Sequence, residues 1–141
     1  MKVYLATPLS QEKREDMHRA LYILRSKGLD VYAPVENTIP NAWDYPNSEW
    51  GLMVFTEDLK AIRSSDIVVM LSYGRMSTAG ANWEAGYAFG TGKKIVLVEM
   101  TDEVMSLMVA NGRYATVKGL DGLAEYDFSK MPKTRTDTEQ K

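Results

Sequence analysis

The most restrictive feature of this chain is an unbroken apolar run at residues 67–71, Ile-Val-Val-Met-Leu, near the middle of the sequence. Short continuous runs of this composition are typical of strands in a parallel sheet that is covered on both faces. Helical patterns flank the run, over residues 50–63 and residues 81–89. The run therefore predicts a central strand of an α/β sheet with helices packed against it.

The same alternation extends over most of the chain. Further strands are expected over residues 2–6, 31–33 and 95–98, and further helices over residues 11–27, 103–109 and 120–126. In the helix at 50–63, apolar side chains recur at intervals of three and four, which predicts that this face is buried: Leu52, Phe55, Leu59 and Ile62. A length of 141 residues agrees with a single domain.

Composition excludes several kinds of chemistry. The chain has no cysteine and a single histidine, His18, so thiolate nucleophiles, a serine–histidine–aspartate triad and a multi-histidine metal site are not expected. A net charge of −2 argues against binding of polymeric nucleic acid. No apolar stretch is long enough for a signal peptide or a membrane span, so we expect a cytoplasmic protein that does not associate with membranes.

Three side chains are candidates for catalysis, each with a structural alternative. Glu84 lies in the first turn of the helix at 81–89, where it either complements the helix dipole or faces the ligand crevice beyond the strands. Asp58 lies beside the apolar stripe of its helix and is either solvated or catalytic. Tyr4, in the first strand, is either a core aromatic or a phenol that donates to a carboxylate.

Seven segments, in this order along the chain, resemble the nucleoside 2-deoxyribosyltransferase family. They are residues 3–8, 34–37, 57–59, 65–67, 80–87, 106–108 and 125–128. The ordered set covers about residues 2–128, although no single motif in it is decisive. The resemblance implies a flavodoxin-like (Rossmann-like) fold, with a catalytic domain at residues 1–128. Residues 129–141 are polar and predict a mobile tail.

The resemblance also implies an activity: cleavage of the N-glycosidic bond of a 2'-deoxyribonucleoside or its 5'-monophosphate, with transfer to another nucleobase. By position, Glu84 would form a covalent deoxyribosyl intermediate, Tyr4 would orient it and Asp58 would exchange a proton with the base. Carboxylate chemistry of this kind needs no metal and no cofactor. Two alternatives stay open, a monophosphate N-hydrolase with water as acceptor and a non-catalytic nucleotide-binding module.

The expected substrate contacts come from several segments. We expect Thr7 and Gly80 to line the site, and Trp43 and Trp50, in and after the irregular stretch at 36–49, to stack on the base. Thr78 and Ser106 stand where the family's free-nucleoside transferases usually carry Asp and Asn. Their hydroxyls suit a 5'-phosphate better than a carboxylate would. The resemblance further implies a homo-oligomer in which Ser106 reaches a neighbouring site.

Overall fold

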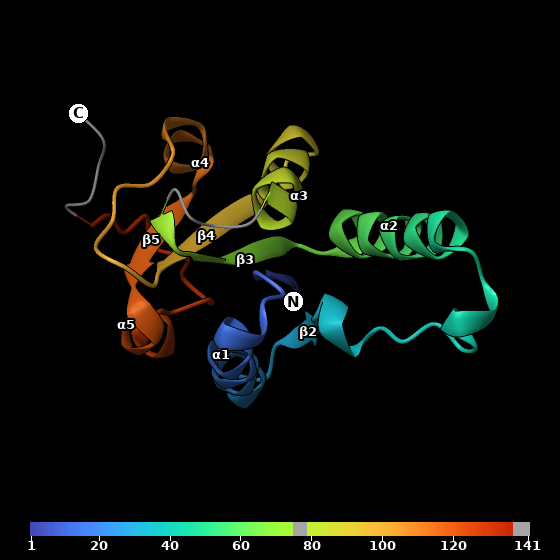
Figure 1. Ribbon diagram of the computed structural model, residues 1–141. Coiled ribbons are helices and arrows are strands. Elements are labelled where there is room, and N and C mark those ends of the chain that lie inside the picture. The colour runs from blue at the N-terminus through green and yellow to red at the C-terminus, as the bar shows by residue number, and fades with distance from the viewer. Residues whose placement is uncertain (75–78, 137–141) are drawn as a thin grey trace.

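A computed structural model describes residues 1–74 and 79–136 of the protein. Its centre is a five-stranded parallel sheet in the order β2-β1-β3-β4-β5 (Figure 1). The strands are β1 (Lys2–Ala6), β2 (Asp30–Tyr32), β3 (Ile67–Ser72), β4 (Lys94–Glu99) and β5 (Ala115–Lys118). All six residues of β3 are buried, which confirms the prediction of a central strand from the apolar run.

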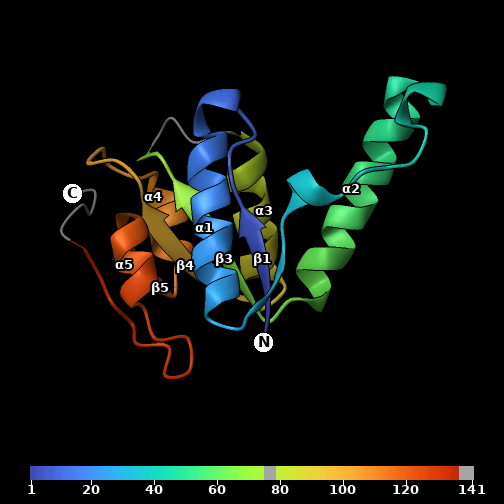
Figure 2. The same cartoon turned by 90° about the horizontal axis from the view of Figure 1, so that it is seen from below.

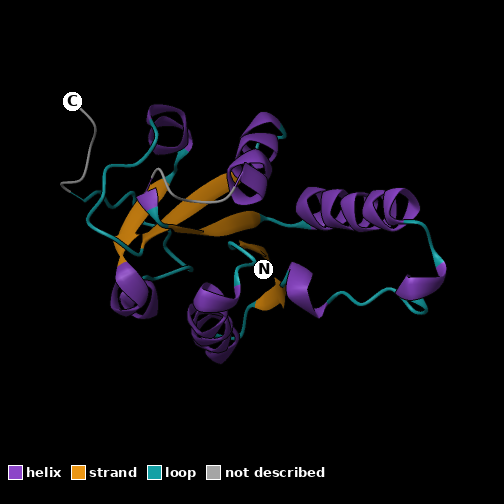
Figure 3. Ribbon diagram, viewed as in Figure 1, coloured by secondary structure: helices purple, strands orange, loops and turns teal. Residues whose placement is uncertain are grey.

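Helices cover both faces of the sheet (Figure 3). α1 (Arg14–Ser26) follows a 3-10 turn, η1 (Gln11–Lys13), and packs with α5 (Gly119–Glu125) on one face. α3 (Ala79–Gly90) and α4 (Leu107–Gly112) cover the other face. Because successive side chains of a strand point to opposite faces, Leu5 belongs to the core under α1, and Tyr4 to the core under α3.

α2 (Asn47–Ser64) differs from the other helices because most of it extends past the β2 edge of the sheet (Figure 2). Only Ala61 and Ile62, near its C-terminal end, are buried. The prediction that the whole apolar face is buried was therefore wrong: Leu52 is 64% exposed and Phe55 46%. The periodicity of the sequence identifies an apolar face correctly, but it does not say whether this chain supplies a surface to cover that face.

The two short helical turns before α2 are η2 (Pro34–Glu36) and η3 (Ala42–Asp44). η3 lies within the stretch at residues 36–49 that the sequence marks as irregular, and η2 ends where that stretch begins; together they lead the chain from β2 out to the start of α2 (Figure 1). The segment from β2 to α2 therefore forms an arm that extends past the β2 edge of the sheet.

The C-terminal third departs from the prediction in two places. The sequence did not indicate β5, which has only four residues and follows directly after a short helix. α4 begins at Leu107, whereas the pattern predicted a helix over residues 103–109.

The mobile tail expected over residues 129–141 stays a prediction, and residues 137–141 lie outside the described part of the chain. Within that part, the amide of Thr116 in β5 donates to the carbonyl of Thr134, and the Thr134 hydroxyl donates to the carbonyl of Thr116. Among the described residues, no helix combines the length and apolar character needed to cross a bilayer.

Candidate active site

A pocket of about 750 Å³ lies between α2 and the first two turns of α3, beyond the carboxyl end of β1. Because α3 begins at Ala79, Glu84 lies in its second turn, and the prediction that Glu84 lies in the first turn of this helix was wrong. Ligands of open parallel sheets bind at this edge, so the position of the pocket agrees with the fold. α2 contributes Trp50, Phe55 and Asp58 to its walls, and α3 contributes Trp83 and Glu84. The walls are mostly apolar, with a few polar groups, which is the composition of a site for a small organic ligand.

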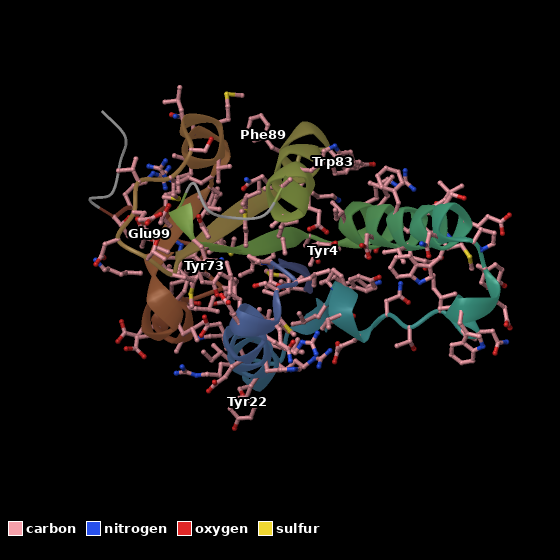
Figure 4. All side chains as sticks on the ribbon, in the orientation of Figure 1. Tyr4, Tyr22, Tyr73, Trp83, Phe89 and Glu99 are labelled. Carbon is pink, nitrogen blue, oxygen red and sulfur yellow. The ribbon has the colours of Figure 1, made fainter. Side chains whose placement is uncertain are left out.

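Glu84 and Tyr4 are joined across the sheet surface. The Tyr4 hydroxyl donates a hydrogen bond to Oε2 of Glu84. The Tyr4 side chain is fully buried beneath α3, so the phenol is fixed by packing as well as by this bond (Figure 4). The second carboxylate oxygen, Oε1, accepts no hydrogen bond from residues 1–74 or 79–136. Because Glu84 lines the pocket, Oε1 is the oxygen available to a ligand.

Asp58 is held in a similar way by a second tyrosine. The Tyr32 hydroxyl, at the end of β2, donates to Oδ1 of Asp58 over 3.0 Å. The rings of Tyr32 and Tyr4 are stacked, with their centroids 5.6 Å apart and their planes 18° from parallel. The two carboxylates that line the pocket therefore each accept a hydrogen bond from one member of a stacked pair of phenols.

The electrostatics of the pocket favour the protonated forms of these groups. Burial raises the pKa of Glu84 to about 7, and the nearby charge of Asp58 adds to the rise, although the hydrogen bond from Tyr4 opposes it. Burial also raises the pKa of Asp58, and the hydrogen bond from Tyr32 opposes that rise. Burial and the Glu84 carboxylate raise the pKa of Tyr4, which keeps the phenol a donor. Shifted carboxylates in a cleft are typical of catalytic sites.

The other predicted substrate contacts fall into three groups. Thr7, Trp50 and Gly80 line the pocket together with the two carboxylates. Trp43, on η3, is 84% exposed and is not part of the pocket wall, and Ser106 precedes α4 outside the wall. The predicted role of Thr78 lies outside the described residues, and the roles of Trp43 and Ser106 stay predictions.

Aromatic residues that sequence reasoning did not assign to the site also contribute to it. Trp83, which directly precedes Glu84 and is labelled in Figure 4, lines the pocket. Its ring contacts that of Phe55 of α2 at a centroid distance of 5.5 Å. Tyr32 appeared in the sequence only as a strand residue. Its position at the same register as Tyr4 on a neighbouring strand is the signal that the sequence alone could not supply.

The described residues contain no group of three or more histidine, cysteine or acidic side chains arranged to hold a metal ion. What the pocket does offer is two carboxylates, each hydrogen-bonded to a phenol outside the lining, and an aromatic wall. Such a set can deliver a nucleophilic oxygen and exchange a proton with a planar ligand.

Comparison with known proteins identifies relatives of this chain. The family model for nucleoside 2-deoxyribosyltransferase matches residues 3–130. A nucleoside deoxyribosyltransferase from Lactobacillus johnsonii is 30% identical over 87 residues, which are 60% of this chain and 58% of that protein. This match therefore spans little more than half the length of the Lactobacillus protein.

Solved structures agree with that family match. The 2-deoxyribosyltransferase of Bacillus psychrosaccharolyticus superposes with a TM-score of 0.88 at 29% identity, over 96% of this chain and 99% of that chain. A CMP N-glycosidase from Clostridium botulinum superposes with a TM-score of 0.60 at 17% identity, over 89% and 96% of the two chains. The second similarity shows a shared fold alone.

Proposed function

Because this chain belongs to the nucleoside 2-deoxyribosyltransferase family, we propose that it cleaves the N-glycosidic bond of 2'-deoxyribonucleosides or their 5'-monophosphates and transfers the deoxyribosyl group to another nucleobase. The observation that carries this proposal is the Glu84 carboxylate, hydrogen-bonded to a buried phenol and lining a pocket of about 750 Å³ beside a second carboxylate. The related enzymes from Lactobacillus and Bacillus support the class of reaction.

In the first step, Oε1 of Glu84 attacks C1' of the deoxyribose. An ester bond forms between Glu84 and C1', the C1'–N bond breaks, and its electron pair leaves with the base. The hydrogen bond from Tyr4 to Oε2 supports this role because it orients the carboxylate and leaves Oε1 facing the ligand. The transition state resembles an oxocarbenium ion, so an anion next to C1' stabilises it.

Asp58 supplies the proton that the departing base requires. Its raised pKa supports this role, because a general acid must hold its proton near the working pH. In the second step a nitrogen of an incoming base attacks C1', its proton passes to Asp58, and the ester bond to Glu84 breaks. Two inversions at C1' leave the configuration unchanged.

We expect the base to lie against the aromatic wall. Trp50 and Trp83 both line the pocket, and each is about half exposed, at 43% and 52%, so a planar ligand can cover them. Stacking of this kind tolerates several bases and contributes about 1–3 kcal/mol per base. Thr7 and Gly80, which also line the pocket, are suited to contact the sugar.

The far end of the sugar is proposed to meet hydroxyl groups of Thr78 and of Ser106 from a neighbouring copy. Leu107 and Met108 directly follow Ser106 and are 57% and 80% exposed, which supports a contact between copies at this helix. Hydroxyl donors suit a 5'-phosphate, so the proposal expects dCMP to be cleaved with a higher kcat/KM than deoxycytidine. Elution of an active protein as a monomer in gel filtration would contradict the neighbour's contribution.

Chromatography of reaction mixtures tests the proposed activity. Deoxynucleosides and their monophosphates are incubated with the protein, with and without a second base, and free bases and new nucleosides are measured. The proposal expects a new nucleoside whenever a second base is present, and loss of turnover in Glu84→Ala with an unchanged circular dichroism spectrum. Free base without exchange would indicate a hydrolase, and calorimetric binding without turnover would indicate a binding module. More than a few per cent residual activity in Glu84→Ala would overturn the nucleophile.

A further inference from the structure

Tyr4 and Tyr32 form a matched pair at the end of the sheet. β1 and β2 are parallel, and Tyr4 and Tyr32 are register partners, so their side chains leave the same face of the sheet next to each other. Their rings stack at 5.6 Å, and each hydroxyl donates to a different carboxylate of the pocket. In the proposed reaction Tyr4 orients the Glu84 carboxylate, whereas no role has been assigned to Tyr32.

We infer that Tyr32 is a positioning residue for proton transfer. Its hydroxyl donates to Oδ1 of Asp58, so that Oδ2 is the oxygen that gives a proton to the departing base and takes one from the incoming base. This inference rests on the proposed function, because it concerns the same site and the same reaction. Three observations carry it. The hydrogen bond from Tyr32 to Oδ1 measures 3.0 Å, Asp58 lines the pocket, and Oδ2 accepts no hydrogen bond from the described residues.

The hydrogen bond distinguishes the two oxygens of Asp58 chemically. In a protonated carboxyl group the carbonyl oxygen is the better acceptor, so a phenol that donates to Oδ1 favours the proton on Oδ2. When Oδ2–H passes its proton to the departing base, Asp58 becomes a carboxylate and the Tyr32 hydroxyl stabilises the new charge through Oδ1. In the second step the incoming base returns a proton to Oδ2, and the hydrogen bond to Oδ1 is kept throughout.

The surroundings of Asp58 agree with a phenol that stays protonated. Burial and the Asp58 carboxylate raise the pKa of Tyr32, although a hydrogen bond with the Asn37 side chain opposes the rise. The titratable groups that interact with Asp58 come from three other elements and from its own helix. They are Tyr32 of β2, Tyr4 of β1, Glu84 of α3, and Glu57, which precedes Asp58 in α2. Among these, Tyr32 is the group whose hydrogen bond lowers the pKa of Asp58.

The hydrogen bond has a second possible effect, which the test must separate from catalysis. α2 has few buried residues, so the bond from Tyr32 also ties this helix to the sheet. Loss of that tie would loosen the pocket and weaken turnover of every substrate. Loss of positioning for proton transfer would instead affect only substrates whose leaving group needs a proton.

Two leaving groups therefore distinguish the effects. A deoxynucleoside needs a proton on its departing base, whereas 4-nitrophenyl 2-deoxyriboside releases a stable phenolate without one. For Tyr32→Phe, which keeps the ring stacked on Tyr4, we expect kcat/KM for the deoxynucleoside, which reports the step that releases the base, to fall about tenfold, a part of the 10²–10⁴ that general acid catalysis contributes. The aryl substrate should keep its kcat/KM within about twofold. Tyr22→Phe, at an exposed tyrosine of α1, is the matched control and should leave both rates unchanged.

A double-mutant cycle completes the experiment. If Tyr32 acts through Asp58, adding Tyr32→Phe to Asp58→Asn should cost no further activity with the deoxynucleoside. Equal loss on both substrates, no loss on either, or a further loss in the Asp58→Asn background would each overturn the inference while the proposed function stands. A wild-type protein that cleaves neither substrate would instead overturn the proposed function, and this inference with it.

Discussion

Replacing Glu84 by glutamine is expected to make the protein more stable at neutral and alkaline pH. Burial is the main reason that the pKa of Glu84 is raised, from 4.5 to about 7. A protonated carboxyl and an amide have nearly the same shape, and the amide oxygen still accepts the hydrogen bond from Tyr4. The substitution therefore removes the titration and leaves most of the packing in place.

The size and sign of the effect follow from linkage. Below pH 4.5 both the folded and the unfolded wild type are protonated at Glu84, so the group adds no pH dependence there. Between pH 4.5 and 7 the folded state binds more protons than the unfolded state, so wild-type stability falls as the pH rises. A shift of 2.5 units at 1.36 kcal/mol per unit gives a cost of about 3 kcal/mol, complete above pH 7.

Urea unfolding at a series of pH values measures this cost. We expect the difference in unfolding free energy between Glu84→Gln and wild type to grow by about 3 kcal/mol from pH 4.5 to pH 8, with unchanged m values. Glu125→Gln, at an exposed position of α5, gives the background effect of removing one carboxylate. A difference that stays constant over this range, or that shrinks, would refute a buried carboxylate at Glu84.

Three further predictions concern activity. With 4-nitrophenyl 2-deoxyriboside, whose leaving group needs no proton from Asp58, kcat/KM should rise about tenfold per pH unit up to about pH 7, because burial raises the pKa of Glu84 to about 7. Initial rates between pH 5 and 9 measure this profile, and a flat profile would contradict the prediction. Asp58→Asn should lower kcat/KM for a deoxynucleoside by about 10²–10⁴ and leave kcat/KM for the aryl substrate nearly unaffected, and equal losses would argue against its role as an acid. Trp50→Ala should raise the KM for a deoxynucleoside about tenfold through lost stacking, and an unchanged KM would argue that the base binds elsewhere.

The sequence was sufficient for the parts of the fold that depend on local pattern. The apolar run at the centre of β3 predicted a buried strand, and the alternation around it predicted the parallel sheet. β5 was not predicted, because a strand of four residues is too short to show a recognisable periodicity. Burial of the apolar face of α2 was predicted wrongly for a different reason. Periodicity indicates which side chains are apolar, but their burial depends on what packs against them.

The site shows the same division between local pattern and three-dimensional arrangement. Family resemblance connected Glu84, Tyr4 and Asp58, and the structure gives two of these a direct hydrogen bond. Tyr32 and Phe55 could not be assigned from the sequence, because their relevance depends on strand register and on how α2 crosses the pocket. Contacts between residues far apart in the chain carry no local signal, even when each residue is conspicuous.

The central claim is that Glu84 forms a covalent bond to the sugar, and mass spectrometry of a trapped intermediate tests it most directly. A 2'-fluorinated arabinonucleoside serves as the probe, because the electron-withdrawing fluorine slows breakdown of the glycosyl ester. After incubation and peptic digestion, the account predicts that the peptide containing Glu84 gains the mass of the fluorinated pentosyl group, and that Glu84→Gln gains none. An adduct on Asp58, or turnover of deoxynucleosides that persists in Glu84→Gln, would contradict the account.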